Sequence, residues 1–261
     1  MVDPVHAIES GDLFAVASFL GAADGNRYWV DRSGRTALWW AARCDQVVVA
    51  TLILSVMDPT DRHRSDYRRR TALHVGTVHG SAPTIALLLA AGLRGDVADI
   101  DGNTVLHAAL LGQRDSHIAS MVLSAAGGRP CLFVRNKAEQ LPIEIAALYN
   151  RLDLVRLMVD RYASPVPASA GVLALRHGHL PLIRYLVREA IGVRYPVALL
   201  LDTELDQIKV PGDIRPAVRR AIQHGLAQRR ARRDDLHAFL AGSWPRVPVA
   251  IITRITEFVL G

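Results

Sequence analysis

Cysteine, aromatic residues and long apolar runs are all scarce in this sequence. Only Cys44 and Cys131 occur among 261 residues, which excludes a disulfide framework or a four-cysteine metal site and favours a reducing compartment. Aromatic residues make up 6% of the chain, which favours closely packed helices with small aliphatic side chains over a large mixed core. No stretch approaches the roughly 20 apolar residues that cross a bilayer, and the residues from Met1 to Pro4 lack the basic flank and apolar run of a signal peptide. We therefore expect no signal peptide and no membrane partner.

Lysine is the next scarce residue. Only Lys137 and Lys209 are lysines among the 31 basic residues, and the formal net charge is +6. An acidic or nucleic-acid partner is one explanation of the charge, and a GC-rich genome, whose codons favour arginine, is the other. The arginines are spread along the chain, and no aromatic-studded basic face accompanies them. We therefore expect no nucleic-acid partner.

A short pattern recurs at intervals of about 33 residues. It reads Thr36-Ala37-Leu38, then Thr71-Ala72-Leu73-His74, then Thr104-Val105-Leu106-His107. The series resembles the ankyrin family, whose repeats carry a Thr-Pro-Leu-His-x-Ala core. This resemblance implies an all-α solenoid of stacked helical hairpins that holds another protein.

The residues of the pattern each have a physical reason. Threonine suits the start of a helix, because its side-chain oxygen accepts a hydrogen bond from an unsatisfied backbone N–H there. The leucine two positions later starts the buried face, and the small Ala41-Ala42, Gly76 and Ala108-Ala109 let two helices approach closely. Apolar residues at steps of three and four then indicate a second helix in each copy, over residues 47–54, 84–89 and 117–123.

Weaker copies extend the series in both directions. Residues 3–20, 141–159 and 169–187 keep parts of the pattern, the last with a degenerate first helix. Terminal repeats are expected to be atypical because they cap the stack. We therefore predict about five to six repeats over residues 3–190, followed by a small helical module over residues 191–261.

The turn before each threonine differs between copies. Gly34 and Gly102 stand two residues before the threonine, where a tight turn favours glycine. Arg69 and Glu139 hold that place in the other two copies. We expect a looser turn at those two positions.

The turn tips and first helices of such a stack form a long concave surface. Its side chains are expected to contact the captured protein, and Trp39 is the main candidate because exposed tryptophans often anchor binding. Trp40 is expected in the core. The candidate residues for protein binding are Arg35, Trp39, Arg43, Arg68, Arg70, Asn103 and Tyr149.

The C-terminal eighteen residues contain a separate apolar helical face. Pro248 suits the first turn of a helix, and Ile251, Ile255, Phe258 and Val259 follow at steps of four, three and one. The face either packs on an arginine-rich helix expected over residues 214–233 or is offered to another protein. The arginine run of residues 229–233 is a solvated helical face or a nuclear address.

This tail resembles a truncated F-box, in which Leu-Pro precedes an apolar helix. Val247-Pro248 takes the place of Leu-Pro, and Trp244 lies three residues before Val247. Ala250 stands where the family usually has glutamate. Ankyrin repeats followed by such a tail resemble the poxvirus ankyrin proteins with a PRANC tail. The resemblance implies that a Skp-type adaptor of a cullin-RING ubiquitin ligase binds Trp244, Val247, Pro248, Ile251, Ile255, Phe258 and Val259.

Three functional hypotheses follow. In the first, the repeats capture a host protein and the tail docks the ligase, with the protein in the host-cell cytoplasm or, through the arginine run, the nucleus. In a variant, the tail is a SOCS box that binds elongin, although Val247-Pro248-Val249-Ala250 lacks the second proline of that motif. In the third, the chain is a scaffold or decoy that sequesters a host signalling protein, and the tail only caps the stack by packing on Leu236 and Phe239.

Chemistry of other kinds is not expected. His74 with His79 and His177 with His179 occupy repeat and turn positions, so we expect no metal there. Asp96, Asp99 and Asp101 lack the closing glutamate of a calcium loop and predict an aspartate-rich turn. No phosphate loop or nucleophile motif is present. We therefore expect no cofactor and no enzymatic activity.

Overall fold

The computed structural model describes residues 3–21, 28–112, 116–125, 128–164 and 166–188, together with residues 212, 215–224, 227, 231, 234 and 235. Within these ranges the regular elements are helices, joined by loops with three isolated antiparallel bridges. The chain divides into two compact units, Met1–Ile145 and Ala146–Gly261, with the division inside helix α10. The predicted all-α class is confirmed for the described residues.

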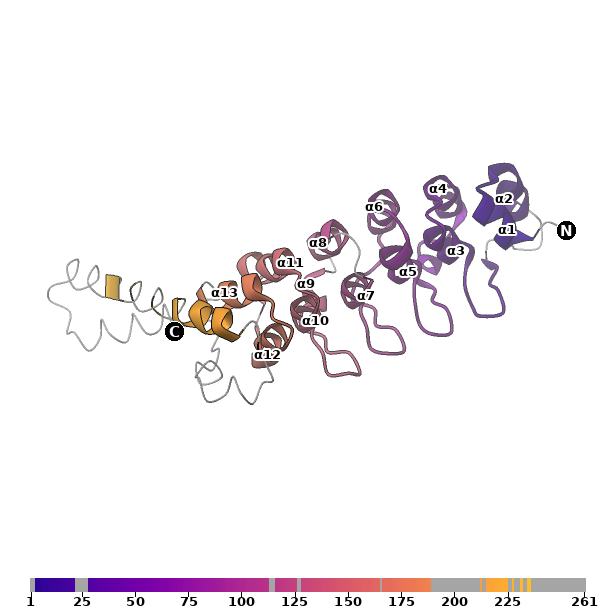
Figure 1. Ribbon diagram of the computed structural model, residues 1–261. Helices are drawn as coiled ribbons and strands as arrows, with labels where there is room; N and C mark the ends of the chain where they lie inside the picture. The colour runs from indigo at the N-terminus through magenta and orange to yellow at the C-terminus, as the bar shows by residue number, and fades with distance from the viewer. Residues whose placement is uncertain are drawn as a thin grey trace. The chain divides into compact units, whose positions relative to one another are not determined.

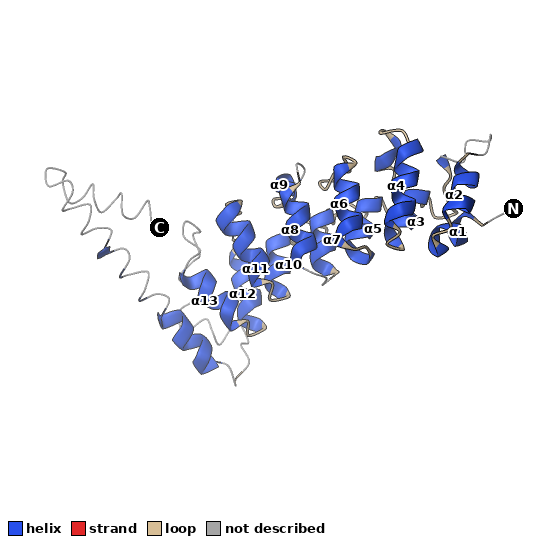
Figure 2. Cartoon of the chain, turned by 90° about the horizontal axis from the view of Figure 1, so that it is seen from above, coloured by secondary structure: helices blue, strands red, loops and turns tan. Residues whose placement is uncertain are grey.

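The first unit contains four helical hairpins in two rows, which Figures 1 and 2 show. The first helices pack on one another in chain order, and so do the second helices. The first helices are α1 (Pro4–Ser10), α3 (Ala37–Arg43), α5 (Ala72–His79) and α7 (Val105–Leu111). The second helices are α2 (Leu13–Leu20), α4 (Val47–Val56), α6 (Ala82–Ala90) and α8 (Ser116–Ser124). A short helix, α9 (Gly128–Cys131), follows.

The second unit continues with helices of the same size. It contains the end of α10 (Pro142–Leu148), α11 (Leu152–Arg156), a π-helical turn (Leu157–Arg161), α12 (Ala168–Arg176) and α13 (Leu180–Arg188). The first helix of the last copy was expected to be degenerate, but α12 is a complete helix of nine residues. Residues 215–224 are also helical, within the helix predicted over residues 214–233.

Threonine residues start helices α3, α5 and α7, as predicted. Thr36 Oγ1 accepts a hydrogen bond from the backbone N–H of Trp39 at 3.1 Å, and Thr71 and Thr104 form the same cap with His74 and His107. The leucine two residues after each threonine is fully buried, as are Ala41 and Ala42. The core therefore lies between the two rows of helices.

The loops between hairpins are tight turns with a common geometry, and they project beyond the row of first helices in Figure 1. Gly34 and Gly102 have φ angles of 75° and 77°, which glycine adopts readily. Arg69 and Glu139 have φ angles of 59° and 58° at the matching positions. The looser turn expected at these two residues is therefore wrong, because both adopt the left-handed conformation.

An acidic or amide side chain explains why all four turns keep this shape. One side-chain oxygen accepts backbone N–H groups two and four residues later, at 2.8 to 3.0 Å. The residues that do so are Asp31, Asp66, Asp99 and Asn136. The predicted aspartate-rich turn is confirmed at Asp99. These bonds hold the backbone in place whether or not the following position is glycine.

Neighbouring turns are joined by backbone hydrogen bonds. The N–H of Tyr67 donates to the carbonyl of Ser33 at 3.0 Å, and the N–H of Ile100 donates to that of Arg68 at 2.8 Å. The N–H of Lys137 donates to the carbonyl of Asp101 at 2.9 Å. These three bonds form a ladder that fixes the spacing of the loops and hence of the side chains beside them.

Candidate functional site

A buried histidine connects each of the α5 and α7 repeats to the loop that follows it. In the α5 repeat, the backbone N–H of Thr71 donates to Nδ1 of His74 at 3.3 Å, so the neutral ring carries its proton on Nε2. That Nε2 lies 3.2 Å from the carbonyl oxygen of Asn103 in the following loop. His107 repeats the arrangement with Thr104 and with the carbonyl of Gln140 at 3.1 Å. These hydrogen bonds give both histidines a structural role.

Burial lowers the pKa of His74 below its ordinary value of 6.5, and it lowers the pKa of His107 in the same way. For His74 the bond to Asn103 and the charges of Asp99 and Asp66 act in the opposite direction but do not cancel the effect of burial. A proton on Nδ1 would also face the N–H group of the threonine. Both effects favour the neutral form of the two rings.

Trp39 takes the place of this histidine in the α3 repeat. It stands three residues after Thr36, as His74 stands three residues after Thr71. Its indole cannot make the bond to the next loop, and its Nε1 is a buried donor without an acceptor among the described residues. The guanidinium carbons of Arg35 and Arg70 lie 5.2 and 5.6 Å from the indole ring centre instead, within cation–π range.

The expected exposure of Trp39 is wrong. Its side chain is 2% exposed, because the arginines of two neighbouring loops cover it. Trp40 lies in the core as predicted, at 9% exposed. The Nε1 of Trp40 donates to the carboxylate of Asp31 at 3.2 Å, so only the first of the two indoles lacks an acceptor.

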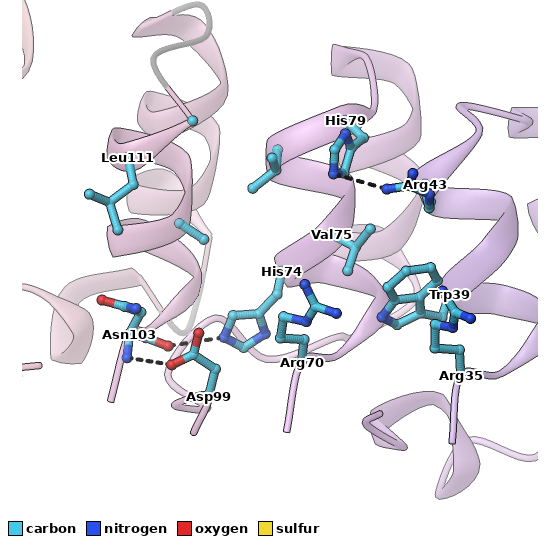
Figure 3. Close-up of a pocket in the computed structure, with 13 residues that line it drawn as sticks. Arg35, Trp39, Arg43, Arg70, His74, Val75, His79, Asp99, Asn103 and Leu111 are labelled. Atoms are coloured by element: carbon cyan, nitrogen blue, oxygen red, sulfur yellow. Dashed lines mark hydrogen bonds between the residues drawn. The ribbon is translucent and has the colours of Figure 1, made fainter. Parts of the chain in front are cut away.

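A hollow of about 420 Å³ lies beside Trp39, across the first helices α3, α5 and α7 (Figure 3). Arg43 and His79 lie at one end of it, where α3 and α5 terminate, and their Nη1 and Nε2 atoms are 3.3 Å apart. Loop residues form the other end. The full lining is Arg35, Trp39, Arg43, Arg70, His74, Val75, Val78, His79, Asp99, Asn103, Ala108, Leu111 and Gly112.

Most of the predicted binding residues meet at this hollow. Arg35, Trp39, Arg43, Arg70 and Asn103 all line it. Arg68 lies on the loop tips, outside the hollow, where its Nη2 is 3.0 Å from a carboxylate oxygen of Asp101. Tyr149 is half-buried and belongs to the second compact unit, so it does not line the hollow. The structure thus brings these five predicted residues together at one hollow.

The apolar side of the hollow was missed. Val78 and Leu111 occupy, in their own repeats, the position that Arg43 occupies in its repeat. That shared register is the signal that could have found them, together with Val75 and Ala108. The predicted ligase-binding residues, Trp244, Val247, Pro248, Ile251, Ile255, Phe258 and Val259, lie outside the described residues.

Other kinds of site find no support among the residues that the structure describes. These residues contain no group of three or more histidine, cysteine or acidic side chains placed to hold a metal ion. None of their helices combines the length and the apolar character needed to cross a membrane. Cys131 is fully buried, and burial raises the pKa of its thiol to about 11, so it is a poor nucleophile.

Comparison with known proteins agrees with the repeat geometry. No protein-family model matches the sequence. Inversin from Mus musculus, an ankyrin-repeat protein, is 26% identical over 160 residues, which cover 61% of this chain and 15% of inversin. The chain therefore spans a small part of the length of this relative. The described residues of the present chain have an all-α fold of helical hairpins, consistent with an ankyrin-like repeat. The threonine–histidine caps of α5 and α7 resemble the ankyrin core motif, and Trp39 departs from that pattern.

Proposed function

We propose that this chain is a non-catalytic adaptor that captures a partner protein on the hollowed face of its ankyrin repeats. The observation that carries the proposal is the hollow beside Trp39, which gathers one tryptophan and three arginines on adjacent repeats. Arginine is enriched among the residues that dominate binding energy at protein interfaces, and here the arginines, not the buried Trp39, present the surface. Apolar Val78 and Leu111 add surface that a partner can bury.

In the finer form of the proposal, the captured protein is a host protein that the chain presents to a cullin-RING ubiquitin ligase. The support is the resemblance of residues 244–261 to a truncated F-box and of the whole arrangement to poxvirus PRANC proteins. Val247-Pro248 would begin the docking helix, and Ile251, Ile255 and Phe258 would contact the Skp-type adaptor. Catalysis then belongs to the ligase, and this chain contributes proximity.

Co-precipitation with a Skp-type adaptor tests the finer proposal. We expect the full chain to retain the adaptor, and a chain lacking residues 244–261 or carrying Ile255→Asp to lose it. Leu260→Asp is the matched control, because helical spacing would place Leu260 on the side opposite Ile251, Ile255 and Phe258. Retention of the adaptor by the shortened chain, or capture of elongin in its place, would contradict the proposal.

A second candidate is a scaffold or decoy that sequesters a host signalling protein without a ligase. It is favoured by one observation: the hollow lies wholly within the first compact unit and uses no residue of the tail. In that case the partner is inhibited at unchanged abundance, and removal of residues 244–261 leaves the inhibition intact. Measuring the abundance of the captured protein separates the two candidates.

A further inference from the structure

We infer that the hollow beside Trp39 binds a segment of the partner protein that carries an aspartate or glutamate next to an apolar residue. This inference rests on the proposed capture function and specifies the chemistry of its ligand.

Two side chains that line the hollow, both from the α3 repeat, differ from those at the matching positions of the next two repeats. Where the next two repeats have His74 and His107, this repeat has Trp39, and it thereby lacks the histidine bond to the following loop. A buried donor without an acceptor destabilises the fold. Where the next repeats have Val78 and Leu111, this repeat has Arg43. The repeat is thus less suited to stacking than its neighbours, and the two changed side chains line the same hollow.

The charges around the hollow are unbalanced at Arg43. The other two lining arginines are paired, Arg35 with Asp31 at 2.6 Å and Arg70 with Asp66 at 2.8 Å. Arg43 is exposed and has no carboxylate within ion-pair distance among the described residues. Its contact is with the ring of His79, at 3.3 Å.

The lining carboxylate does not neutralise this cation. One carboxylate oxygen of Asp99 accepts two backbone N–H groups of its own turn, from Asp101 at 2.9 Å and from Asn103 at 2.8 Å. An incoming carboxylate would therefore find, at one end of the hollow, a guanidinium that contacts His79 and has no carboxylate partner among the described residues, so a charge-assisted hydrogen bond is available there. A basic ligand would meet three arginines.

The shape and polarity of the hollow determine the size of the ligand and the apolar character of its second side chain. Val75, Val78, Ala108 and Leu111 line it on the side of α5 and α7, and Leu111 is 40% exposed. A volume of about 420 Å³ holds a few side chains, at the lower end of the range of binding pockets. A ligand whose acidic side chain contacts Arg43 and whose neighbouring apolar side chain contacts Leu111 would occupy both the charged and the apolar part of the hollow.

The test uses the purified full chain and an array of peptides of about 12 residues, a length that spans neighbouring repeats. Each sequence places Asp or Glu beside Leu, Val or Tyr, and each is printed again with Asn or Gln in place of the acid. We expect the acidic member of binding pairs to be retained roughly tenfold more strongly than its amide counterpart. Arg43→Val should abolish this preference, and Trp39→His should weaken binding of both members.

The chain supplies its own controls. Trp39→His and Arg43→Val install the residues that the next repeat carries at the same positions, His74 and Val78. Arg32→Val removes the same charge from an exposed loop tip outside the hollow and should leave the preference intact. Arg43 is at the surface, so its variant tests the inference even if Trp39→His lowers stability, which urea unfolding monitors.

The inference is overturned if no peptide is retained, if acidic and amide versions bind alike, or if Arg32→Val and Arg43→Val act equally. It is also overturned if a single-stranded oligonucleotide displaces the peptides and binds through Arg43 more strongly than they do. The array contains no ligase component, so loss of Skp-type adaptor binding leaves its result unchanged. Conversely, equal binding of both peptide versions removes the acidic preference and leaves protein capture standing.

Discussion

The Nε2 atom of His74 lies 3.2 Å from the carbonyl oxygen of Asn103, in the loop of the following repeat. His107 makes the same contact with Gln140, whereas Trp39 makes none. The strength with which adjacent repeats are joined therefore varies along the first unit. The junction between α3 and the loop that carries Arg70 lacks the histidine bond that the next two junctions contain.

Stability should fall as the pH is lowered, because the pKa values of His74 and His107 are held below the ordinary 6.5 by burial. Above that value both rings are neutral in the folded and unfolded chain. Below it the unfolded chain takes up protons that the folded chain resists, so the free energy of unfolding decreases until the lower folded pKa is passed. Urea midpoints at about pH 7.5, 6.5 and 5.5 measure the effect. The double variant His74→Gln, His107→Gln should show a flatter profile, and an unchanged slope would assign the effect to other groups.

The two kinds of turn tip should respond oppositely to substitution. Gly102→Ala places a Cβ 3.0 Å from the backbone nitrogen of Lys137 and forces a side chain into left-handed backbone, so it should destabilise by about 1–3 kcal/mol. Arg69→Gly relieves the left-handed strain at a position already held by Asp66, and it should stabilise by up to about 1 kcal/mol. Thermal and urea unfolding of both variants test the pair. Destabilisation by Arg69→Gly would show that flexibility of the unfolded chain outweighs strain.

Asp66 should be the most sensitive residue of its loop. Its buried carboxylate accepts the backbone N–H groups of Arg68 and Arg70 and pairs with the Arg70 guanidinium. Asp66→Ala removes all of these and should cost about 2–4 kcal/mol, since it leaves donors unpaired. Asp66→Asn is the control, because Asn136 makes the same two backbone bonds in a later loop. Equal losses for alanine and asparagine would assign the effect to the ion pair alone.

Cys131 should resist alkylation in the folded chain. It is fully buried, its Sγ lies 3.0 Å from the carbonyl of Gly95, and burial raises its pKa to about 11. Cys44 is partly exposed, although burial raises its pKa as well. With iodoacetamide at about pH 8, mass spectrometry should find the carbamidomethyl group on Cys44 first and on Cys131 only in concentrated urea. Equal labelling rates in native buffer would contradict the burial.

Local patterns in the sequence were sufficient to predict the repeat and its helices. The threonine caps and the apolar residues at steps of three and four act within one or two turns of a helix, so one copy is enough to recognise them. The turn geometry at Arg69 was not predicted, because it depends on a side chain three residues earlier, Asp66, whose role is visible only when the copies are compared.

The site was only partly predictable for a related reason. Arg35, Arg43 and Arg70 were found because they lie on loops or helix ends, where the repeat places its variable side chains. The burial of Trp39 was not foreseen, since Arg70, which covers it, comes from the next repeat. Contacts between copies depend on both partners at once and cannot be read from either copy by itself.

The ladder of backbone bonds between the loops has a mechanical consequence. Each bond, such as that from Ile100 to Arg68, joins a loop only to its neighbour. A pulling force along the row of loops would therefore act on these hydrogen bonds in series, and the weakest junction would break first. A ligand bound across α3, α5 and α7 would bridge the junction beside Trp39 and would oppose separation of these repeats.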